Sequence, residues 1–278
     1  MKLNPKHTQK AAVAVLGSAT LLTLTALVFI IVFVLQKGLP VLSWGFLTGA
    51  PQDMGRAGGI FPAIAGSAAL TVLSVLLAAP LGVGTAVYLT EYTRESRLTA
   101  VIRFGADCLA GIPSIIFGLF GFILFVTILK MGWSLLAGGL TLALMILPTI
   151  IRTTEEAIKA VPLSYREVSY SLGATRWQTV YKVILPNALP GILTGVMLGV
   201  GRALGETAAV IFTAGSSLRM PSSIFDSVRT MAVHFYLLAR EGISAENAYG
   251  TAAALIIAVL SVNLLAYWMM NRMIAKRT

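Results

Sequence analysis

Ala11–Leu35 reads AAVAVLGSATLLTLTALVFIIVFVL, a run of 25 residues without a charged side chain. About 20 consecutive apolar residues are enough for a helix to cross the hydrocarbon core of a bilayer. The rest of the chain has the same character, because 57% of its residues are hydrophobic and only 12% are charged, with a mean hydropathy of +0.85. Soluble domains average about 25% charged residues. The composition therefore predicts a protein that crosses the membrane several times.

Six apolar stretches are long enough to span a bilayer, which predicts an all-α, polytopic membrane fold with six transmembrane helices. The third and fourth are separated by little more than Lys130, so they are expected to form a tight helical hairpin. The first is longer than the apolar region of a secretory signal, and no small-residue cleavage site follows it, so it is expected to be retained. The six stretches are Ala11–Leu35, Ile60–Thr90, Phe104–Leu129, Met131–Ile151, Gly191–Gly215 and Ala248–Met270.

Lys and Arg are distributed unevenly over the segments that separate these stretches. One side of the membrane carries fourteen of them and the other carries six. Cytoplasmic loops are the ones enriched in Lys and Arg, so the richer side, with both termini, is placed in the cytoplasm. This distribution accounts for the net charge of +10 without a nucleic-acid partner. The cytoplasmic segments are residues 1–10, 91–103, 152–190 and 271–278, and the outer ones are residues 36–59, 130 and 216–247, of which the two long ones are expected to hold short interfacial helices.

The cytoplasmic loop 152–190 carries eight charged residues between two apolar stretches. Thr153 or Thr154 is expected to cap a first short helix. Pro162 suits the start of a second helix, and Gly173 suits the left-handed position that ends it. The loop is therefore predicted to contain short helices that meet at a glycine turn.

The second of these helices, residues 163–172, has an apolar stripe formed by Leu163, Val168 and Leu172. Such a stripe is expected to pack either against the inner ends of the chain's own spans or against a partner protein, and the pattern leaves both alternatives open. After the glycine turn, Thr175 is expected to cap a third helix that ends before Pro186.

The same loop resembles the EAA loop of ABC importer permeases. Glu167-Val168-Ser169 is followed by Gly173 and then by Val183-Ile184-Leu185-Pro186, at the family's spacing. Val-Ser replaces the usual Ala-Ala, and Val183 replaces the usual Ile. The resemblance implies a type I permease domain over residues 60–270 and a coupling helix that docks on separate ATPase subunits, which bind ATP and Mg. The coupling residues implied in this way are Arg166, Glu167, Leu172, Gly173, Ala174, Leu185 and Pro186.

Three further strings are similar to the phosphate-uptake branch of these permeases. They are Gly59–Ile64 (GIFPAI), Ile112–Gly118 (IPSIIFG) and Gly201–Ala208 (GRALGETA). Chain length and the GETA sequence resemble the PstA-type subunit more than its PstC-type partner. The resemblance implies a bacterial inner-membrane location, a PstC-type second permease subunit and an external phosphate-binding protein. Sulfate, molybdate and phosphonate permeases share the architecture, so the oxyanion stays open.

Arg202 and Glu206 are charged residues inside the fifth apolar stretch, where charges are expensive and must face protein or a water-filled path. Being four residues apart, they are expected to share one face of a helix. In one interpretation Arg202 meets a passing oxyanion through its guanidinium and Glu206 limits how tightly that anion binds. In the other, the two form an ion pair that fixes helix packing.

Four glycines on the same stretch form two G-x-x-x-G spacings, which allow close approach of another helix. They are Gly195, Gly199, Gly201 and Gly205. With the family resemblance, they suggest that the fifth span lies near a subunit interface. Asp107, near the inner end of the third stretch, is expected to cap its helix or extend towards the membrane surface, with a place on the transport path as the alternative.

Other chemistry is sparse in this sequence. There is no G-x-x-x-x-G-K-[ST] motif, so the chain is not expected to hydrolyse ATP itself. His7 and His234 are isolated and lack metal-ligand spacing, and Ser114 has no His nearby to activate it. No catalytic residue and no metal site is therefore assigned.

Two other functional classes compete with an importer permease. A secondary transporter predicts inverted repeats and more ionisable groups at mid-membrane, and a membrane-embedded enzyme predicts a cluster of His, Asp, Glu or Cys near one face. The sequence shows neither clearly. Arg219, Asp226 and Arg229, in the last outer segment, are expected either to touch a substrate-delivery protein or to be solvated loop residues.

Overall fold

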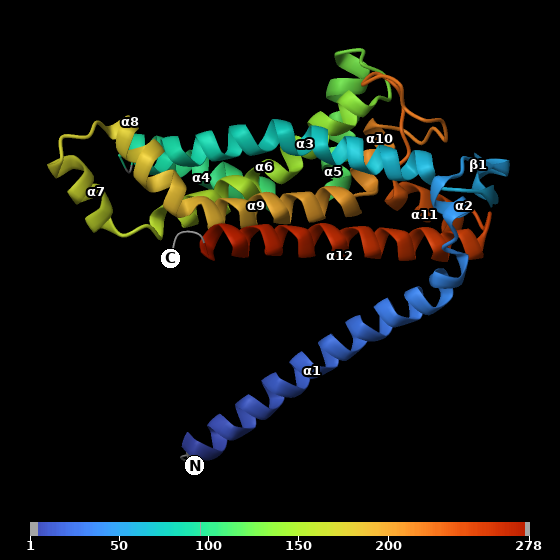
Figure 1. Cartoon of the computed structure of the whole chain (residues 1–278), viewed down its shortest axis with the longest axis horizontal. Helices are drawn as coiled ribbons and strands as arrows, with labels where there is room; N and C mark the ends of the chain where they lie inside the picture. Colours follow the sequence, from blue (N-terminus) through green and yellow to red (C-terminus); the bar gives the residue numbers. More distant parts are fainter. Residues whose placement is uncertain (1–4, 95, 276–278) are drawn as a thin grey trace.

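A computed structural model describes residues 5–94 and 96–275, and the chain is about 80% helical, which confirms the all-α membrane fold. Within these residues, five helices are long and apolar enough to cross a membrane, or six if one bent pair counts as a single span. The long helices of the bundle run roughly side by side, while α1 points away from them (Figure 1).

Three long helices, α3, α6 and α9, form the centre of the bundle. Large aliphatic side chains of α6 are completely buried there, among them Leu142, Ile146 and Ile150. Helix α12 lies along α9 on one side of this core (Figure 1). The bounds are α3 Phe61–Val87, α6 Leu135–Lys159, α9 Leu185–Gly205 and α12 Ala245–Ala275.

Helix α1 (Pro5–Gly38) contacts the bundle only at its outer end, where Gly38 packs closely on Tyr249 of α12. None of the apolar window of α1 is buried within the chain. Because a helix that is apolar on all sides must be covered, lipid or a neighbouring subunit has to surround it. The first and last helices both point their free ends towards the end of the bundle that carries α7 (Figure 1).

The third expected span is not a single straight helix, which corrects the prediction for Phe104–Leu129. The chain forms α4 (Arg97–Ala110) and then α5 with η4 (Ser114–Gly121 and Phe122–Ile128), bent by 102° at the break between them. Pro113 lies at the break, where it has no backbone N–H to donate and disfavours helix in the residue before it. The expected tight hairpin with the fourth span is also wrong in detail, since Ser134 caps α6 only after an irregular segment.

Helix α6 extends eight residues beyond the expected end at Ile151, so Thr153 and Thr154 lie inside it and cap nothing. The hydroxyl of Thr153 instead donates to the backbone carbonyl of Thr149 at 2.8 Å. Inner-end residues such as Glu155 are buried against the bundle, which extends the helix past the apolar stretch.

The predictions for the middle of the loop are confirmed. Helix α7 (Leu163–Ser171) begins directly after Pro162, and Gly173 has a left-handed φ of 78°. Thr175 caps α8 (Arg176–Thr179) by accepting from the N–H of Gln178.

The end expected before Pro186 is wrong, because α8 continues through η5 (Val180–Ile184) into α9 as one candidate span, Arg176–Gly205. The π-helical turn η5 ends two residues before Pro186, whose missing N–H would interrupt a regular helix.

Short elements gather at the end of the bundle opposite α7 (Figure 1). Two-residue strands β1 and β2 pair antiparallel there, with Pro51 opposite Gly58. The short helices expected in the outer segments are confirmed by α2 and α11. The bounds are η1 Leu39–Val41, α2 Trp44–Thr48, β1 Pro51–Gln52, η2 Asp53–Gly55, β2 Ala57–Gly58, α10 Ala208–Thr213 and α11 Met231–Arg240. A further short element, η3 Tyr88–Tyr92, follows α3 at the α7 end.

Candidate functional site

The apolar stripe of α7 is exposed, which excludes the alternative that it packs against the chain's own spans. Leu163 is 72% exposed, Val168 60% and Leu172 83%. The chain's own spans therefore do not cover this stripe. Glu167 and Gly173 are exposed beside it, and α7 lies beyond the end of the bundle (Figure 1). The arrangement is an apolar tip suited to a groove on another protein.

Arg166, on the same helix, faces the bundle instead. Its guanidinium Nη2 donates to Oε1 of Glu91 at 2.8 Å and Nε donates to the same oxygen at 3.2 Å. The two nitrogens Nη1 and Nη2 also donate to the backbone carbonyls of Val161 and Ile158, at 2.8 and 3.0 Å. Arg166 therefore lies apart from the exposed tip, and Glu91 is a partner that the sequence analysis did not identify.

A buried base supports the exposed tip. The hydroxyls of Ser169 and Thr179 share a hydrogen bond of 2.9 Å between α7 and α8, and both residues are buried. A separate apolar cluster joins the ends of α3, α6 and α9 that lie nearest to α7. Its buried members are Ala86, Ile158, Val161, Val180, Ile184, Ala188 and Ile192, with Leu185 packed against them.

The last part of the expected coupling motif lies in this base. Leu185 and Pro186 occupy the first turn of α9 and are half-buried, and Ala174 is half-buried in the turn before α8. The expected coupling residues thus separate into an exposed tip, an inward-facing arginine and a packed base.

Arg202 and Glu206 do not share a helix face, which corrects the expected pairing. Helix α9 ends at Gly205, and Glu206 has extended backbone angles, φ −74° and ψ 130°. The carboxylate of Glu206 accepts a hydrogen bond of 3.1 Å from the N–H of Ala209 in α10. Among the described residues no ion pair joins Glu206 to Arg202. The spacing of four residues fails as evidence because the helix breaks between the two charges.

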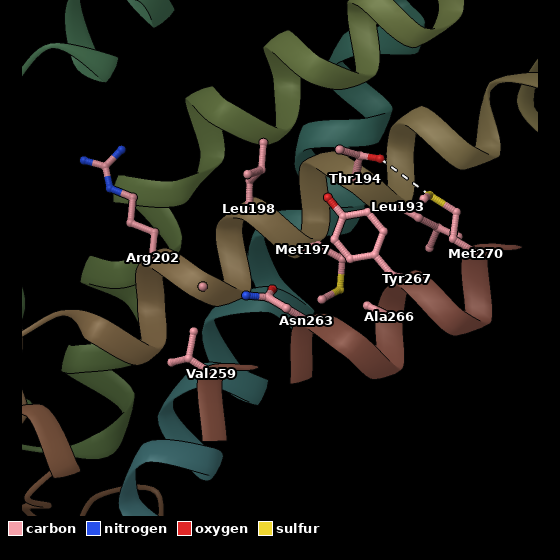
Figure 2. A pocket seen from close by; sticks show the side chains of 11 residues that line it. Leu193, Thr194, Met197, Leu198, Arg202, Val259, Asn263, Ala266, Tyr267 and Met270 are labelled. Carbon is pink, nitrogen blue, oxygen red and sulfur yellow. Dashed lines mark hydrogen bonds between the residues drawn. The ribbon is translucent and has the colours of Figure 1, made fainter. Parts of the chain in front are cut away.

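Arg202 lines a pocket of about 440 Å³ between α9 and α12. Figure 2 shows its side chain pointing away from Tyr267 and Met270 at the other end of this pocket. There, Thr194 Oγ1 donates to Met270 Sδ at 3.7 Å. In the part of the chain that the structure describes, the guanidinium of Arg202 forms no hydrogen bond or ion pair.

The four glycines of α9 have two different surroundings. A Cβ added at Gly195 would lie 1.9 Å from Thr153 Oγ1, so the glycine allows α9 to approach α6 closely, and Gly199 faces Ile150 at ordinary contact distance. A Cβ at Gly201 or Gly205 would meet nothing within 4 Å. The first G-x-x-x-G spacing therefore lies at a packing contact inside the chain, and the second faces open space.

Further ion pairs connect α4 with α6 at the inner end. Asp107 binds Arg152, and Arg103 Nε lies 2.6 Å from Glu155 Oε1, which also binds Lys159 at 3.0 Å. Asp107 is therefore paired with Arg152 and does not cap its helix. No group of three or more His, Cys, Asp or Glu within residues 5–94 and 96–275 is placed to hold a metal ion.

The outer segment holds its charged residues in local structure. The carboxylate of Asp226 accepts from the backbone N–H and the hydroxyl of Ser222 and from the N–H of Ser223, all at 2.8 Å, and these bonds lower its pKa. Arg219 is exposed. Asp226 therefore stabilises its own loop.

Arg229 and His234 form a buried pair at the start of α11. Arg229 is only 7% exposed and its Nε donates to the Ser216 carbonyl at 2.8 Å, while Nη1 lies 3.4 Å from His234 Nδ1. Burial, and secondarily the charge of Arg229, lowers the pKa of His234 to about 4. The imidazole is therefore neutral at pH 7, and Arg229 is not available to a docking protein.

The apolar helices and the exposed loop around α7 are those of a multi-pass membrane protein of the permease class. Residues 78–278 match the family described as binding-protein-dependent transport system inner membrane component. The chain is 34% identical over 292 aligned residues to the probable ABC transporter permease protein YqgI of Bacillus subtilis strain 168, with 99% of each chain covered. It belongs to this family of ABC importer permeases.

A phosphate system permease and a solved transporter are also similar. The chain is 37% identical over 213 residues to the phosphate transport system permease protein PstA of Mycobacterium leprae, which covers 75% of this chain and 69% of that protein. The crystal structure of a bacterial alginate ABC transporter in complex with a periplasmic protein matches with a TM-score of 0.67 at 16% identity, over 95% of this chain and 96% of that one. That structural match supports the fold alone.

Proposed function

We propose that this chain is the non-catalytic, PstA-type permease subunit of an importer for inorganic phosphate. Similarity to PstA proteins of several bacteria, at 33–37% identity, supports the choice of phosphate over other oxyanions. On the Lys and Arg count, α7 and both termini lie on the cytoplasmic side of a bacterial inner membrane. In Figure 1 the N-terminal end of α1 and the C-terminal end of α12 are both directed towards the α7 end, which is consistent with this topology.

The observation that carries the proposal is the exposed apolar tip of α7 on its buried base. Leu163, Val168 and Leu172 project from the inner end without cover. An ATPase subunit, which would bind ATP and Mg, docks on this tip. Closure of the ATPase subunits on ATP moves α7, and the base transmits that movement to the spans, so the path opens alternately to the two sides.

Arg202 supplies a contact on the anion path. An unpaired guanidinium inside a span is costly, and a phosphate oxyanion offers oxygens that match its donors. Glu206 has a separate role, since it caps α10 and keeps the break after Gly205 in place. A PstC-type second permease subunit completes the path, lipid surrounds the assembly, and an external phosphate-binding protein delivers the anion.

Co-expression with a candidate ATPase, second permease and binding protein tests the proposal. The tagged chain should bring down the ATPase and second permease, and proteoliposomes of the complex should take up radiolabelled phosphate only with ATP. Unlabelled sulfate, molybdate or phosphonate should compete poorly. A chain that purifies alone and moves phosphate without ATP would contradict the proposal and favour a secondary transporter.

Arg202→Gln should lower ATP-driven phosphate uptake at least about tenfold, because it removes a charged hydrogen-bond donor, while the complex still assembles. The exposed Arg97→Gln, at the start of α4 and away from the outer segments, serves as the matched control and should keep normal uptake. If Arg202→Gln instead prevents assembly, Arg202 packs against a neighbouring subunit and does not line the path.

A further inference from the structure

The inner end of α3 is attached to α7 by one ion pair. Glu91 lies in the π-helical turn η3, directly after α3, and Arg166 lies in the first half of α7, 75 residues later in the chain. Their side chains are mostly buried, 7% exposed for Glu91 and 14% for Arg166. Two other ion pairs at this end join α4 to α6: Arg152 with Asp107 is more than half exposed on both sides, and Arg103 with Glu155 is 25% and 5% exposed.

The same guanidinium also binds the end of α6. Arg166 donates to the carbonyl of Ile158, in the last turn of α6, and to that of Val161, two residues after the helix ends. One side chain of α7 therefore connects to the ends of two spans, to α3 through the carboxylate of Glu91 just after it and to α6 through the carbonyl of Ile158. The ion pair does not involve the apolar tip of α7. The tip residues Leu163, Val168 and Leu172 are exposed.

The pair cannot separate easily. Moving Arg166 away would leave the Glu91 carboxylate unpaired in a mostly buried position, which is strongly unfavourable. A displacement of α7 is therefore followed by Glu91 and the inner end of α3. The hydrogen bond between Ser169 and Thr179 connects α7 in the same way to α8 and hence to α9.

We propose that Arg166 and Glu91 are positioning residues that transmit movement of α7 to α3 and α6, and that they do not contact the ATPase. This inference rests on the proposed function, in which a docked ATPase moves α7. Without the pair, the ATPase still docks on the exposed tip, but α3 no longer follows α7. ATP is then hydrolysed with less phosphate carried per ATP.

The test uses the whole complex in proteoliposomes and measures three quantities for each variant: co-purified ATPase, ATP hydrolysed and radiolabelled phosphate taken up. The decisive variant is the double substitution Glu91→Leu with Arg166→Met, because it removes both charges together and leaves no unpaired buried carboxylate. Arg152→Gln, which removes the exposed ion pair at the same end, is the control and should keep the wild-type ratio of phosphate to ATP.

The double variant should bind the ATPase as the wild type does and should lose at least about fivefold in phosphate carried per ATP. A wild-type ratio in the double variant would overturn the inference, since the pair would then serve folding alone. Loss of the ATPase from the double variant would also overturn it, because the pair would then build the docking surface. If the wild-type chain itself brings down no ATPase, the proposed function fails.

Discussion

A half-buried arginine near one end of the bundle and a buried one near the other have different partners. Arg166, at the inner end, is paired with the carboxylate of Glu91 and with two backbone carbonyls. Arg229, at the outer end, has one backbone carbonyl and the imidazole of His234, and no carboxylate within ion-pair distance in the described structure. The contact of Arg166 with Glu91 joins residues 75 positions apart, whereas the bonds of Arg229 go to residues 13 and 5 positions away.

This difference indicates different mechanical roles for the two ends. An ion pair between distant elements makes them move together, because separation leaves a buried charge. Local bonds from Arg229 to its own segment hold the outer segment in one conformation. The contacts at the inner end therefore transmit movement of α7 to the spans. The contacts at the outer end hold the outer segment in place on the bundle.

Replacing each arginine with Met should give the largest effect and should separate the two ends. Arg166→Met leaves Glu91 buried without a partner, so the free energy of unfolding should fall by about 3–5 kcal/mol. Arg229→Met leaves a carbonyl without its donor but also removes a desolvated charge, so the loss should be about 1–2 kcal/mol. Unfolding by SDS in mixed micelles measures both, and equal losses would contradict the comparison.

Acid should weaken the outer end through His234. Its pKa is about 4 when folded and about 6.5 when unfolded, so below pH 6.5 the unfolded state binds more protons. The stabilisation is present above pH 6.5 and is lost as the pH falls towards 4, by about 2 kcal/mol at pH 5. Hydrogen exchange of α11, corrected for the intrinsic rate, should report this loss.

His234→Gln is the control for this pH dependence, because its side chain stays neutral throughout. The variant should show no change in α11 stability between pH 7 and pH 5 beyond that of neighbouring helices. If the stability of α11 falls equally in the wild type and in the variant on acidification, His234 is not responsible for the loss.

The smallest expected effects come from two exposed left-handed glycines, Gly173 after α7 and Gly242 after α11. Their φ values are 78° and 63°, and a Cβ at either would meet no atom within 4 Å. Valine at each should therefore cost a similar amount, about 1–2 kcal/mol, from the backbone alone. Gly173→Val should in addition reduce the ATPase that co-purifies, while Gly242→Val should not. Equal co-purification in both would argue against α7 as the docking element.

Much of the loop that forms the candidate site was predictable because its signals are local. Pro162 begins α7, Gly173 adopts the left-handed turn and Thr175 caps α8, each by the conformational preference of one residue. The errors arose at breaks within the apolar stretches. Hydropathy does not report that α9 stops at Gly205, so the four-residue spacing of Arg202 and Glu206 was misleading.

The sequence by itself determined the membrane class, the helical spans and the family motif, because bilayer insertion and backbone hydrogen bonding depend on short windows of residues. Only the tertiary structure decided which coupling residues face outward. Leu163 and Leu172 are exposed while Arg166, between them in sequence, is turned to Glu91. That choice depends on how α3 and α6 pack beside α7, and packing between segments 75 residues apart leaves no local pattern in the chain.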